Sequence, residues 1–295
     1  MLKGSMTALI TPFRNGGVDW KAFDDLVERQ IAQGTHAVIA CGTTGESPVL
    51  SPDEHKDIVG RCIAVVKGRI PVIAGTGSNC TAKTIEMTRH AKEAGADAAL
   101  IVAPYYNKPT QEGLYAHYRT VAEAVNTPII LYNIPGRSVV DIKNETMMRL
   151  AKVPNIIGVK DATGDLSRPK QVLETIGADF IQLSGEDATV IDFMTAGGHG
   201  CISVTSNVVP DLCAQMHNAW INGDKIQART INDRLMPLHK AMFFETSPAP
   251  AKYAMSRLGL CTDELRLPLV SASPAARKAM DEAMAAVKIE IRKAA

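Results

Sequence analysis

A lysine stands at the end of an apolar segment, where its side chain is costly to bury. Lys160 follows residues 156–159, a run typical of a strand buried in a sheet. Lysine amines are almost entirely charged at neutral pH, but burial favours the neutral form, which can attack a ketone and form an imine. The alternative is a lysine that reaches solvent from a strand end. The residues that surround Lys160 in the fold decide between these interpretations.

Three hydroxyl groups stand at the ends of other apolar segments. They belong to Tyr132, Thr44 and Tyr106. Attack of an amine on a carbonyl and the loss of water that follows both require proton transfer, which positioned hydroxyl groups can provide. Each hydroxyl alone fits ordinary core packing, and Thr43-Thr44 also fits a tight turn. On three separate strand ends they favour catalysis, with Lys160 as the nucleophile.

Two features of the sequence are suited to binding carboxylates. Gly42 and Gly45 flank the two threonines and would let backbone amides approach a small anion closely. Arg137 follows a Pro-Gly pair, so a turn would direct its guanidinium across the site, where it can form two hydrogen bonds with a carboxylate. Position alone leaves an ordinary surface arginine equally open.

Short apolar segments alternate with longer amphipathic ones along the chain. This order predicts repeated β-α units, and eight strands in strict alternation favour an α/β fold with a closed (β/α)8 TIM barrel. Active sites of such barrels lie at the C-terminal ends of the strands, where the polar residues above are found. The expected strands are residues 7–11, 37–41, 71–76, 98–103, 129–133, 156–160, 180–184 and 200–204.

Three further helices are predicted after the eighth strand, at residues 224–242, 247–258 and 273–292. We therefore predict one structural unit with two parts, a catalytic barrel at residues 1–223 and a C-terminal helical appendage at residues 224–295. Ser51, Thr81 and Thr110 are expected to cap helices, and Ser51 is followed by a proline and two acids.

Composition excludes several classes of partner. The chain of 295 residues is 46% hydrophobic and carries 32 Lys and Arg against 31 Asp and Glu, a net charge of +1. This balance gives no electrostatic attraction for nucleic acids or anionic membranes. The sequence contains neither an apolar run long enough for a membrane span nor a signal-peptide core. We expect a cytoplasmic protein without nucleic-acid or membrane partners.

Cofactor and metal motifs are absent from the sequence. The six cysteines form no CxxC pair and have no histidine at zinc-ligand spacing, so we interpret them as small buried hydrophobic residues. The segment Gly75-Thr76-Gly77 is an incomplete dinucleotide motif, because Cys80 occupies its third glycine position. His199 is interpreted as a structural histidine. We expect neither a cofactor nor a metal.

Four segments carry a resemblance to a known family: residues 42–46 (GTTGE), 104–107 (PYYN), 132–137 (YNIPGR) and 157–164 (IGVKDATG). In order and spacing they resemble the pyruvate-dependent class I aldolase family, and the resemblance covers essentially the whole chain. It implies a TIM barrel in which Lys160 forms an imine with pyruvate. It also implies that Tyr132 transfers protons through Thr44 to Tyr106.

The resemblance also implies how the substrates bind. Thr43 and the amide of Thr44 would hold the pyruvate carboxylate, and Arg137 would hold the carboxylate of L-aspartate 4-semialdehyde. The backbone carbonyls of Gly185 and Ile202 would line the site. In the family, the tyrosine that corresponds to Tyr106 reaches into a neighbouring subunit's site, which implies at least a dimer. The resemblance further implies a homotetramer built as a dimer of dimers.

With Arg137 after the Tyr-Asn-Ile-Pro segment, the sequence resembles one branch of this family. That branch condenses pyruvate with L-aspartate 4-semialdehyde to give 4-hydroxy-tetrahydrodipicolinate, in lysine and diaminopimelate biosynthesis. The neuraminate-cleaving branch lacks an arginine here, and a 2-keto-3-deoxy sugar-acid aldolase is the alternative enzyme. A non-catalytic sensor of keto acids is a further alternative, but it requires the loss of a catalytic group and none is missing.

Lysine-regulated members of the family bind lysine at a dimer interface. This chain matches part of that site with Ser47, His55, Asn79 and Tyr105. Pro52 and Lys83 stand where the regulated bacterial enzymes carry a histidine and a glutamate. A proline side chain donates no hydrogen bond, and Lys83 would repel the ammonium groups of free lysine. We therefore expect weak feedback inhibition or none.

Overall fold

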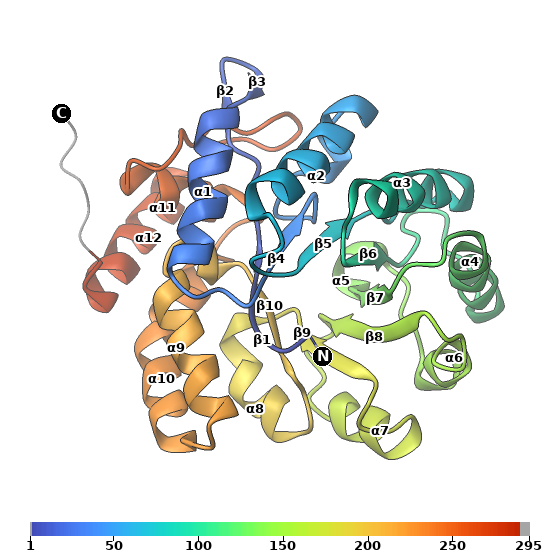
Figure 1. Cartoon of the computed structure of the whole chain (residues 1–295). Coiled ribbons are helices and arrows are strands. Elements are labelled where there is room, and N and C mark those ends of the chain that lie inside the picture. Colours follow the sequence, from blue (N-terminus) through green and yellow to red (C-terminus); the bar gives the residue numbers. More distant parts are fainter. Residues whose placement is uncertain (1, 290–295) are drawn as a thin grey trace.

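Eight parallel strands close into one barrel in the computed structural model, which describes residues 2–289 (Figure 1). Around the barrel they follow the order β1, β10, β9, β8, β7, β6, β5 and β4, and β4 pairs with β1. The predicted TIM barrel is confirmed. The strands are β1 Gly4–Ala8, β4 Ala37–Ala40, β5 Val72–Gly75, β6 Ala98–Val102, β7 Ile129–Asn133, β8 Ile156–Asp161, β9 Ile181–Ser184 and β10 Gly200–Ser203.

Helices follow the strands and surround the barrel (Figure 1). They are α1 Trp20–Ala32, α2 Pro52–Val66, α3 Thr81–Ala94, α4 Gln111–Ala124, α5 Pro135–Ser138, α6 Asn144–Leu150, α7 Arg168–Thr175, α8 Val190–Thr195 and α9 Pro210–Ile221. Short 3-10 helices cover Ser47–Val49, Asp187–Thr189 and Thr205–Asn207. None of the helices within residues 2–289 combines the length and apolar character needed to cross a membrane.

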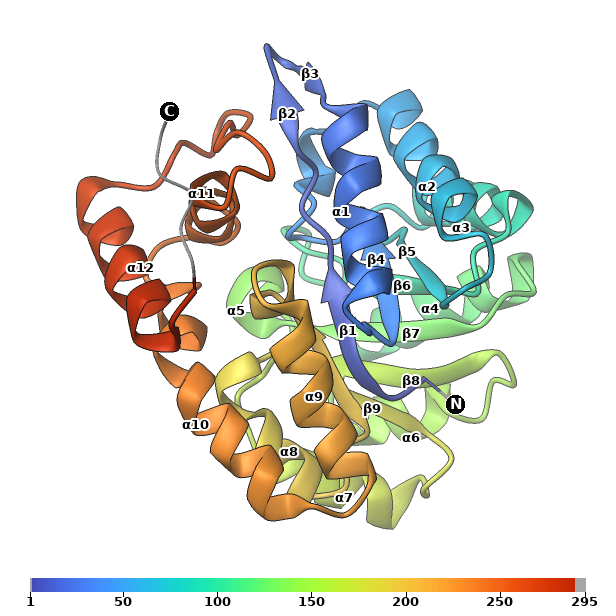
Figure 2. The ribbon, with the colours of Figure 1, turned by 60° about the vertical axis from the view of Figure 1, so that its left-hand side comes forward.

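The C-terminal helices gather on one side of the barrel, as Figure 2 shows. They are α10 Lys225–Ala241, α11 Ala249–Arg257 and α12 Pro274–Val287. One buried hydrophobic cluster contains Val208 and Met216 of the barrel region together with Leu235, Met242 and Met280. Separating these helices from the barrel would therefore expose apolar surface on the helices and on the barrel.

Side-chain alternation along the strands divides the core into two layers. Met6, Ile39 and Leu100 belong to the cluster inside the barrel. Leu131 and Val159 belong to a different cluster, which includes buried residues of α4 and α6. Since successive residues of a strand point to opposite faces, a residue directly after Leu131 or Val159 faces the barrel interior.

The first strand lies earlier than predicted. We expected residues 7–11, and β1 covers Gly4–Ala8. The chain leaves the sheet after Leu9, because the Ile10 amide donates to Asn207 Oδ1 at 3.2 Å and the Thr11 hydroxyl donates to the Gly45 carbonyl at 2.7 Å. Residues beyond the strand are as buried as those within it, so apolar character did not show where the strand ends.

A short hairpin after β1 was not predicted. It consists of β2 Phe13–Arg14 and β3 Gly17–Val18, which pair antiparallel. Asn15 and Gly16 form its turn, with φ angles of 54° and 81°. Asn-Gly is the commonest sequence for a two-residue hairpin turn, so this signal was present in the sequence.

Two of the three expected helix caps are confirmed. Ser51 Oγ accepts from the Glu54 amide at 3.1 Å, and Glu54 accepts from the Ser51 amide at 2.9 Å. Thr110 Oγ1 accepts from the Gly113 amide at 3.2 Å. The third was wrong, because Cys80 occupies the N-cap position of α3. The hydroxyl of Thr81 instead forms a hydrogen bond with a histidine on α4 at 2.9 Å.

The last helix ends earlier than predicted. We expected residues 273–292, whereas α12 ends at Val287 and Lys288 adopts a left-handed conformation with φ of 61°. Positions 290–292 of the prediction lie outside the described residues. Ser273 caps the start of this helix by accepting from the Ala276 amide at 3.2 Å.

Candidate active site

Lys160 and Tyr132 lie side by side at the C-terminal ends of β8 and β7, where the strand register pairs them directly. Both are buried, with 7% and 5% of their surfaces exposed. Lys160 Nζ lies 4.3 Å from the centroid of the Tyr132 ring, and no residue within 2–289 forms an ion pair with it. A buried amine beside a phenol is suited to nucleophilic attack when no carboxylate pairs with it and stabilises its charged form.

The two threonines form part of a tight turn after β4. Cys41 and Glu46 flank the turn, and both adopt the left-handed region, with φ angles of 56° and 55°. Such conformations cost about 1–3 kcal/mol each and persist only where the surroundings hold them. The amides of Thr43 and Thr44 donate no backbone hydrogen bond within the described residues. The turn therefore presents two amide N–H groups that can donate hydrogen bonds to an anion.

Arg137 lies in α5, directly after the Tyr132 strand. Its Nη2 donates to the carbonyl of Ser247, in the segment before α11, at 3.3 Å. Arg137 lines a cavity of about 330 Å³ together with Thr43 and Tyr132. The turn expected at Pro135-Gly136 is the start of the short helix α5, which places Arg137 at this cavity.

Gly185 and Ile202 lie at the ends of β9 and β10. Gly185 donates its amide to the Asp161 carbonyl at 2.7 Å, and a Cβ at this position would lie 2.6 Å from Ala162 Cβ. Only glycine permits this close approach of the backbone. Ile202 is fully buried in the cluster inside the barrel.

Glu186 follows Gly185 and is half-buried. Burial raises the pKa of its carboxyl, while Lys160 and Arg137 lower it. The sequence reasoning did not include Glu186 among the candidate residues.

Tyr106 stands apart from the other candidate residues. It follows β6, 88% of its surface is exposed, and its φ of 70° is left-handed. The structure therefore brings Lys160, Tyr132 and the threonine turn to the barrel mouth but leaves the Tyr106 side chain in solvent. An exposed tyrosine on a strained backbone is an unusual feature for a single chain.

A buried ion pair beside the threonine turn was not predicted. Lys252 of α11 pairs with Glu46, and both side chains are fully buried. Lys252 Nζ also donates to the Glu264 carbonyl at 2.8 Å, and the Arg266 amide donates to Glu46 Oε2 at 3.1 Å. The GTTGE segment contains Glu46, but its partner lies about two hundred residues away in the sequence, so no local pattern connects them.

Asp187 is a further residue that was not predicted from the sequence. It is buried and accepts hydrogen bonds from the Ser203 hydroxyl at 2.5 Å, the Val204 amide at 2.9 Å and the Thr205 amide at 3.2 Å. These contacts fix the turn that directly follows Ile202. The aspartate lies in the segment Ser-Gly-Glu-Asp, but its sequence position does not reveal its partners.

The cysteines are free thiols, and four of the six are buried. The prediction that they are buried was wrong for Cys80, which is exposed, and only partly right for Cys261, which is half-buried. Within residues 2–289, no three His, Cys, Asp or Glu side chains are grouped so as to hold a metal ion. His199 Nδ1 accepts from the Gln182 amide at 3.0 Å, a contact between two strand ends.

Comparisons with known proteins identify the family of the chain. The model of the Dihydrodipicolinate synthetase family matches residues 1–287. The chain is 60% identical over 284 residues to 4-hydroxy-tetrahydrodipicolinate synthase of Rhodospirillum centenum. The matched residues cover 96% of this chain and 98% of that relative.

Solved structures give the same result. Dihydrodipicolinate synthase from Aquifex aeolicus has a TM-score of 0.97 at 43% identity, over 99% of this chain and 100% of that one. The chloride-inhibited enzyme from Acinetobacter baumannii, solved in complex with pyruvate, has a TM-score of 0.96 at 46% identity, over 98% and 100% of the two chains. This chain belongs to the dihydrodipicolinate synthetase family.

Proposed function

We propose that this chain condenses pyruvate with L-aspartate 4-semialdehyde to give 4-hydroxy-tetrahydrodipicolinate, for lysine and diaminopimelate biosynthesis. The relative from Rhodospirillum centenum carries the name of this synthase, and the relative from Acinetobacter baumannii binds pyruvate. The observation that carries the proposal is the buried Lys160 amine beside Tyr132 at the barrel mouth. This is the group that an imine mechanism requires.

The first half of the reaction uses Lys160 as the nucleophile. Its neutral amine attacks C2 of pyruvate, and the carbinolamine loses water to form the imine. Tyr132 supplies and removes the protons, with Thr44 and Tyr106 as further members of the relay. The pyruvate carboxylate accepts from the hydroxyl of Thr43 and the amide of Thr44. The imine then loses a methyl proton and becomes an enamine.

The second half uses Arg137 to hold the other substrate. Its guanidinium binds the carboxylate of L-aspartate 4-semialdehyde through charge-assisted hydrogen bonds. The enamine carbon attacks the aldehyde carbon, whose oxygen is protonated to a hydroxyl. The substrate's amine then attacks C2, closes the ring and expels Lys160 as a free amine. The backbone carbonyls of Gly185 and Ile202 line the site.

Tyr106 acts in a neighbouring subunit's site. In the single chain it is 88% exposed, so it cannot contribute to its own relay as placed. We therefore propose a homodimer as the minimal working unit, in a homotetramer that is a dimer of dimers. Mixing Tyr106→Phe subunits with Lys160→Ala subunits should then restore some complete sites in heterodimers. Failure in demonstrated heterodimers would assign Tyr106 to its own subunit.

We propose the cytoplasm as the compartment. All six cysteines are free thiols, although several are buried, and free thiols persist in a reducing environment.

No cofactor or metal enters the proposed reaction, because the imine itself stabilises the developing carbanion. Dialysis against a chelator should leave the activity unchanged, and a divalent ion should not increase it.

The test is a coupled assay with pyruvate and L-aspartate 4-semialdehyde, with Lys160→Ala as the inactive control. Parallel reactions contain 2-keto-3-deoxy sugar acids, and released pyruvate is measured. We expect condensation of the semialdehyde at a kcat/KM well above that for sugar-acid cleavage. The reverse preference would assign the chain to sugar-acid cleavage and contradict the proposal.

A further inference from the structure

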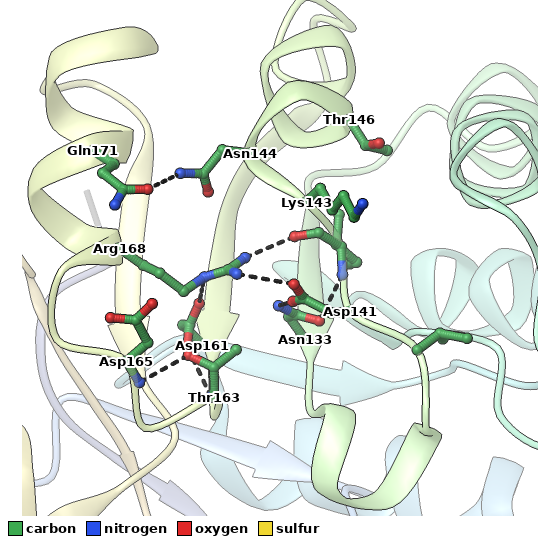
Figure 3. A network of polar contacts seen from close by, with 12 residues as sticks. Asn133, Asp141, Lys143, Asn144, Thr146, Asp161, Thr163, Asp165, Arg168 and Gln171 are labelled. Carbon is green, nitrogen blue, oxygen red and sulfur yellow. Dashed lines mark hydrogen bonds and ion pairs between the residues drawn. The ribbon is translucent and has the colours of Figure 1, made fainter.

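The residues directly after Tyr132 and Lys160 form a polar network behind the catalytic pair. Register pairs Asn133 with Asp161, next to the pair formed by Tyr132 and Lys160. Alternation along a strand directs neighbouring side chains to opposite faces, so Asn133 and Asp161 point away from the reacting groups. Figure 3 shows both side chains in a cluster centred on Arg168.

Arg168, the first residue of α7, binds three acceptors through its guanidinium. Nε donates to Asp161 Oδ2 at 3.0 Å, Nη1 donates to Asp141 Oδ2 at 3.1 Å, and Nη2 donates to the Ile142 carbonyl at 2.7 Å (Figure 3). The planar fork of an arginine can make three such bonds at fixed angles, which a lysine cannot. Arg168 thus connects α7, β8 and the segment after α5.

The network also includes the end of β7. Asn133 Nδ2 donates to Asp141 Oδ1 at 2.6 Å, and Asn133 Oδ1 accepts from the Ile142 amide at 3.0 Å. Asp161 Oδ1 accepts from the amide and hydroxyl of Thr163, at 2.9 and 2.6 Å. The chain of contacts therefore runs from one catalytic strand to the other through Asp141 and Arg168.

The network is mostly shielded from water. The side chains of Arg168 and Asp161 are 11% and 8% exposed, and Asn133 is fully buried. Asp141 is 39% exposed and lies at the edge. Charged groups interact strongly where water is excluded, so these contacts hold their partners more firmly than surface ion pairs do. Removing Arg168 would leave Asp161 as a buried, unpaired carboxylate.

The pairing of β7 with β8 is irregular, which gives this network a specific role. Ile129 pairs with Ile156, but Ile130 pairs with Gly158, so one residue is skipped in β8. A one-residue slip turns every later side chain to the other face of a strand. In the observed register Lys160 pairs with Tyr132, and in a slipped register it would not.

We propose that Arg168 is a positioning residue for the reaction. By binding Asp161 and Asp141, it holds the ends of β7 and β8 in the register that sets Lys160 against Tyr132. The inference rests on the proposed function, because it assumes that Lys160 forms the imine. Arg168 acts through Asp161 and Asn133 and lies outside the cavity formed by Thr43, Tyr132 and Arg137.

The experiment measures imine formation separately from pyruvate binding. Rapid quenching with borohydride gives the rate of imine formation, and exchange of the pyruvate methyl protons with deuterium reports the enamine. The variants are Arg168→Met, which removes the fork, and Arg168→Lys, which keeps the charge. Arg119→Met is the matched control, because Arg119 is 52% exposed on α4 and Glu123 is its one ion-pair partner among residues 2–289. All assays run below the measured unfolding midpoint of each variant.

In Arg168→Met we expect imine formation and deuterium exchange to slow by about a hundred-fold, since a misplacement of about 1 Å can cost that much. The pyruvate KM should change by less than about three-fold, because the carboxylate ligands remain in place. Arg168→Lys should recover part of the rate, and Arg119→Met all of it. Equal rates for folded Arg168→Met and the wild type would overturn the inference.

A second variant keeps the test informative if Arg168→Met does not fold. Asp141→Asn preserves the side-chain shape at the partly exposed edge of the network and removes one carboxylate. We expect a smaller but clear slowing of imine formation at unchanged pyruvate KM. Wild-type rates in both Asp141→Asn and Arg168→Lys would overturn the inference. If instead the wild-type chain forms no imine at all, the proposed function fails rather than this role.

Discussion

Two buried lysines at the barrel mouth differ in their surroundings. Lys252 pairs with Glu46, donates to the Glu264 carbonyl at 2.8 Å and lies over the Phe13 ring. Lys160 has the Tyr132 ring beside it and no ion-pair partner within residues 2–289. A buried lysine that is paired with a carboxylate stabilises structure, whereas one without a carboxylate partner remains available to a substrate.

Burial alone does not distinguish the two lysines. Lys252 is fully buried and Lys160 is 7% exposed, so the more deeply buried lysine is the one that has an ion-pair partner. Burial lowers the pKa of Lys252, and Glu46 opposes this effect by favouring the charged form. The pair lies next to the threonine turn, because the Glu46 amide donates to the Thr43 carbonyl at 3.1 Å.

The largest expected effect separates the two lysines by activity. Lys160→Arg keeps a positive charge but removes the neutral amine, so we expect kcat to fall by more than about a thousand-fold. The measurement is the coupled assay, with thermal unfolding recorded on the same protein. A stable Lys160→Arg variant with substantial activity would assign the nucleophile to another residue.

The next effect separates the lysines by stability. Lys252→Met leaves Glu46 as an unpaired charge in the core, so we expect the free energy of unfolding to fall by about 3–5 kcal/mol. Adding Glu46→Gln should recover much of this loss, because the double variant buries no unpaired charge. Denaturant unfolding measures the free energy of unfolding of the single and the double variant.

A matched control for this pair is available on the surface. Lys21 and Asp25 form an exposed i,i+4 pair on α1, and Lys21→Met should leave the unfolding midpoint nearly unchanged. If Lys252→Met is no less stable than Lys21→Met, the buried pair does not hold the threonine turn.

Arg137 extends the comparison from the nucleophile to the second substrate. Arg137→Ala should lower kcat/KM for L-aspartate 4-semialdehyde by about thirty-fold to a thousand-fold, equivalent to about 2–4 kcal/mol, since a charge-assisted contact is lost. Imine formation with pyruvate should change far less. Equal losses in both steps would indicate a structural arginine and weaken the assignment of the aldehyde substrate.

The smallest expected effect concerns inhibition by free lysine. Pro52, His55, Lys83 and Tyr105 line the same cavity as Thr43 and Arg137, and Lys83 is exposed. An ammonium at residue 83 repels the amines of lysine, so half-inhibition should require well above about 1 mM, an ordinary small-ligand affinity. Lys83→Glu should lower that concentration. Half-inhibition of the wild type below about 1 mM would contradict this interpretation.

The sequence predicted the barrel and the residues at its mouth because both depend on local patterns. Apolar segments at regular intervals gave the strands, and the family resemblance, now confirmed, assigned Lys160, Tyr132 and Arg137. The roles of these residues stay predictions. The first strand was misplaced because its end depends on a contact with Asn207, which lies 197 residues after Ile10 in the sequence.

The residues that hold the site could not be predicted in the same way. Lys252 reads as an ordinary lysine of an amphipathic helix, and Arg168 as a helix-start arginine. Their importance comes from partners that only the fold brings close, namely Glu46 for Lys252, and Asp161 with Asp141 for Arg168. Electrostatic contacts across such distances in sequence leave no periodic pattern.

Reductive trapping tests the difference between the two lysines most directly. The wild-type chain is incubated with pyruvate and borohydride, digested, and the peptides of Lys160 and Lys252 are compared by mass. We expect one pyruvate-derived adduct on Lys160, loss of activity in proportion to it, and no adduct on Lys252. An unmodified Lys160 in protein that remains active, or an adduct on Lys252 instead, would contradict the account.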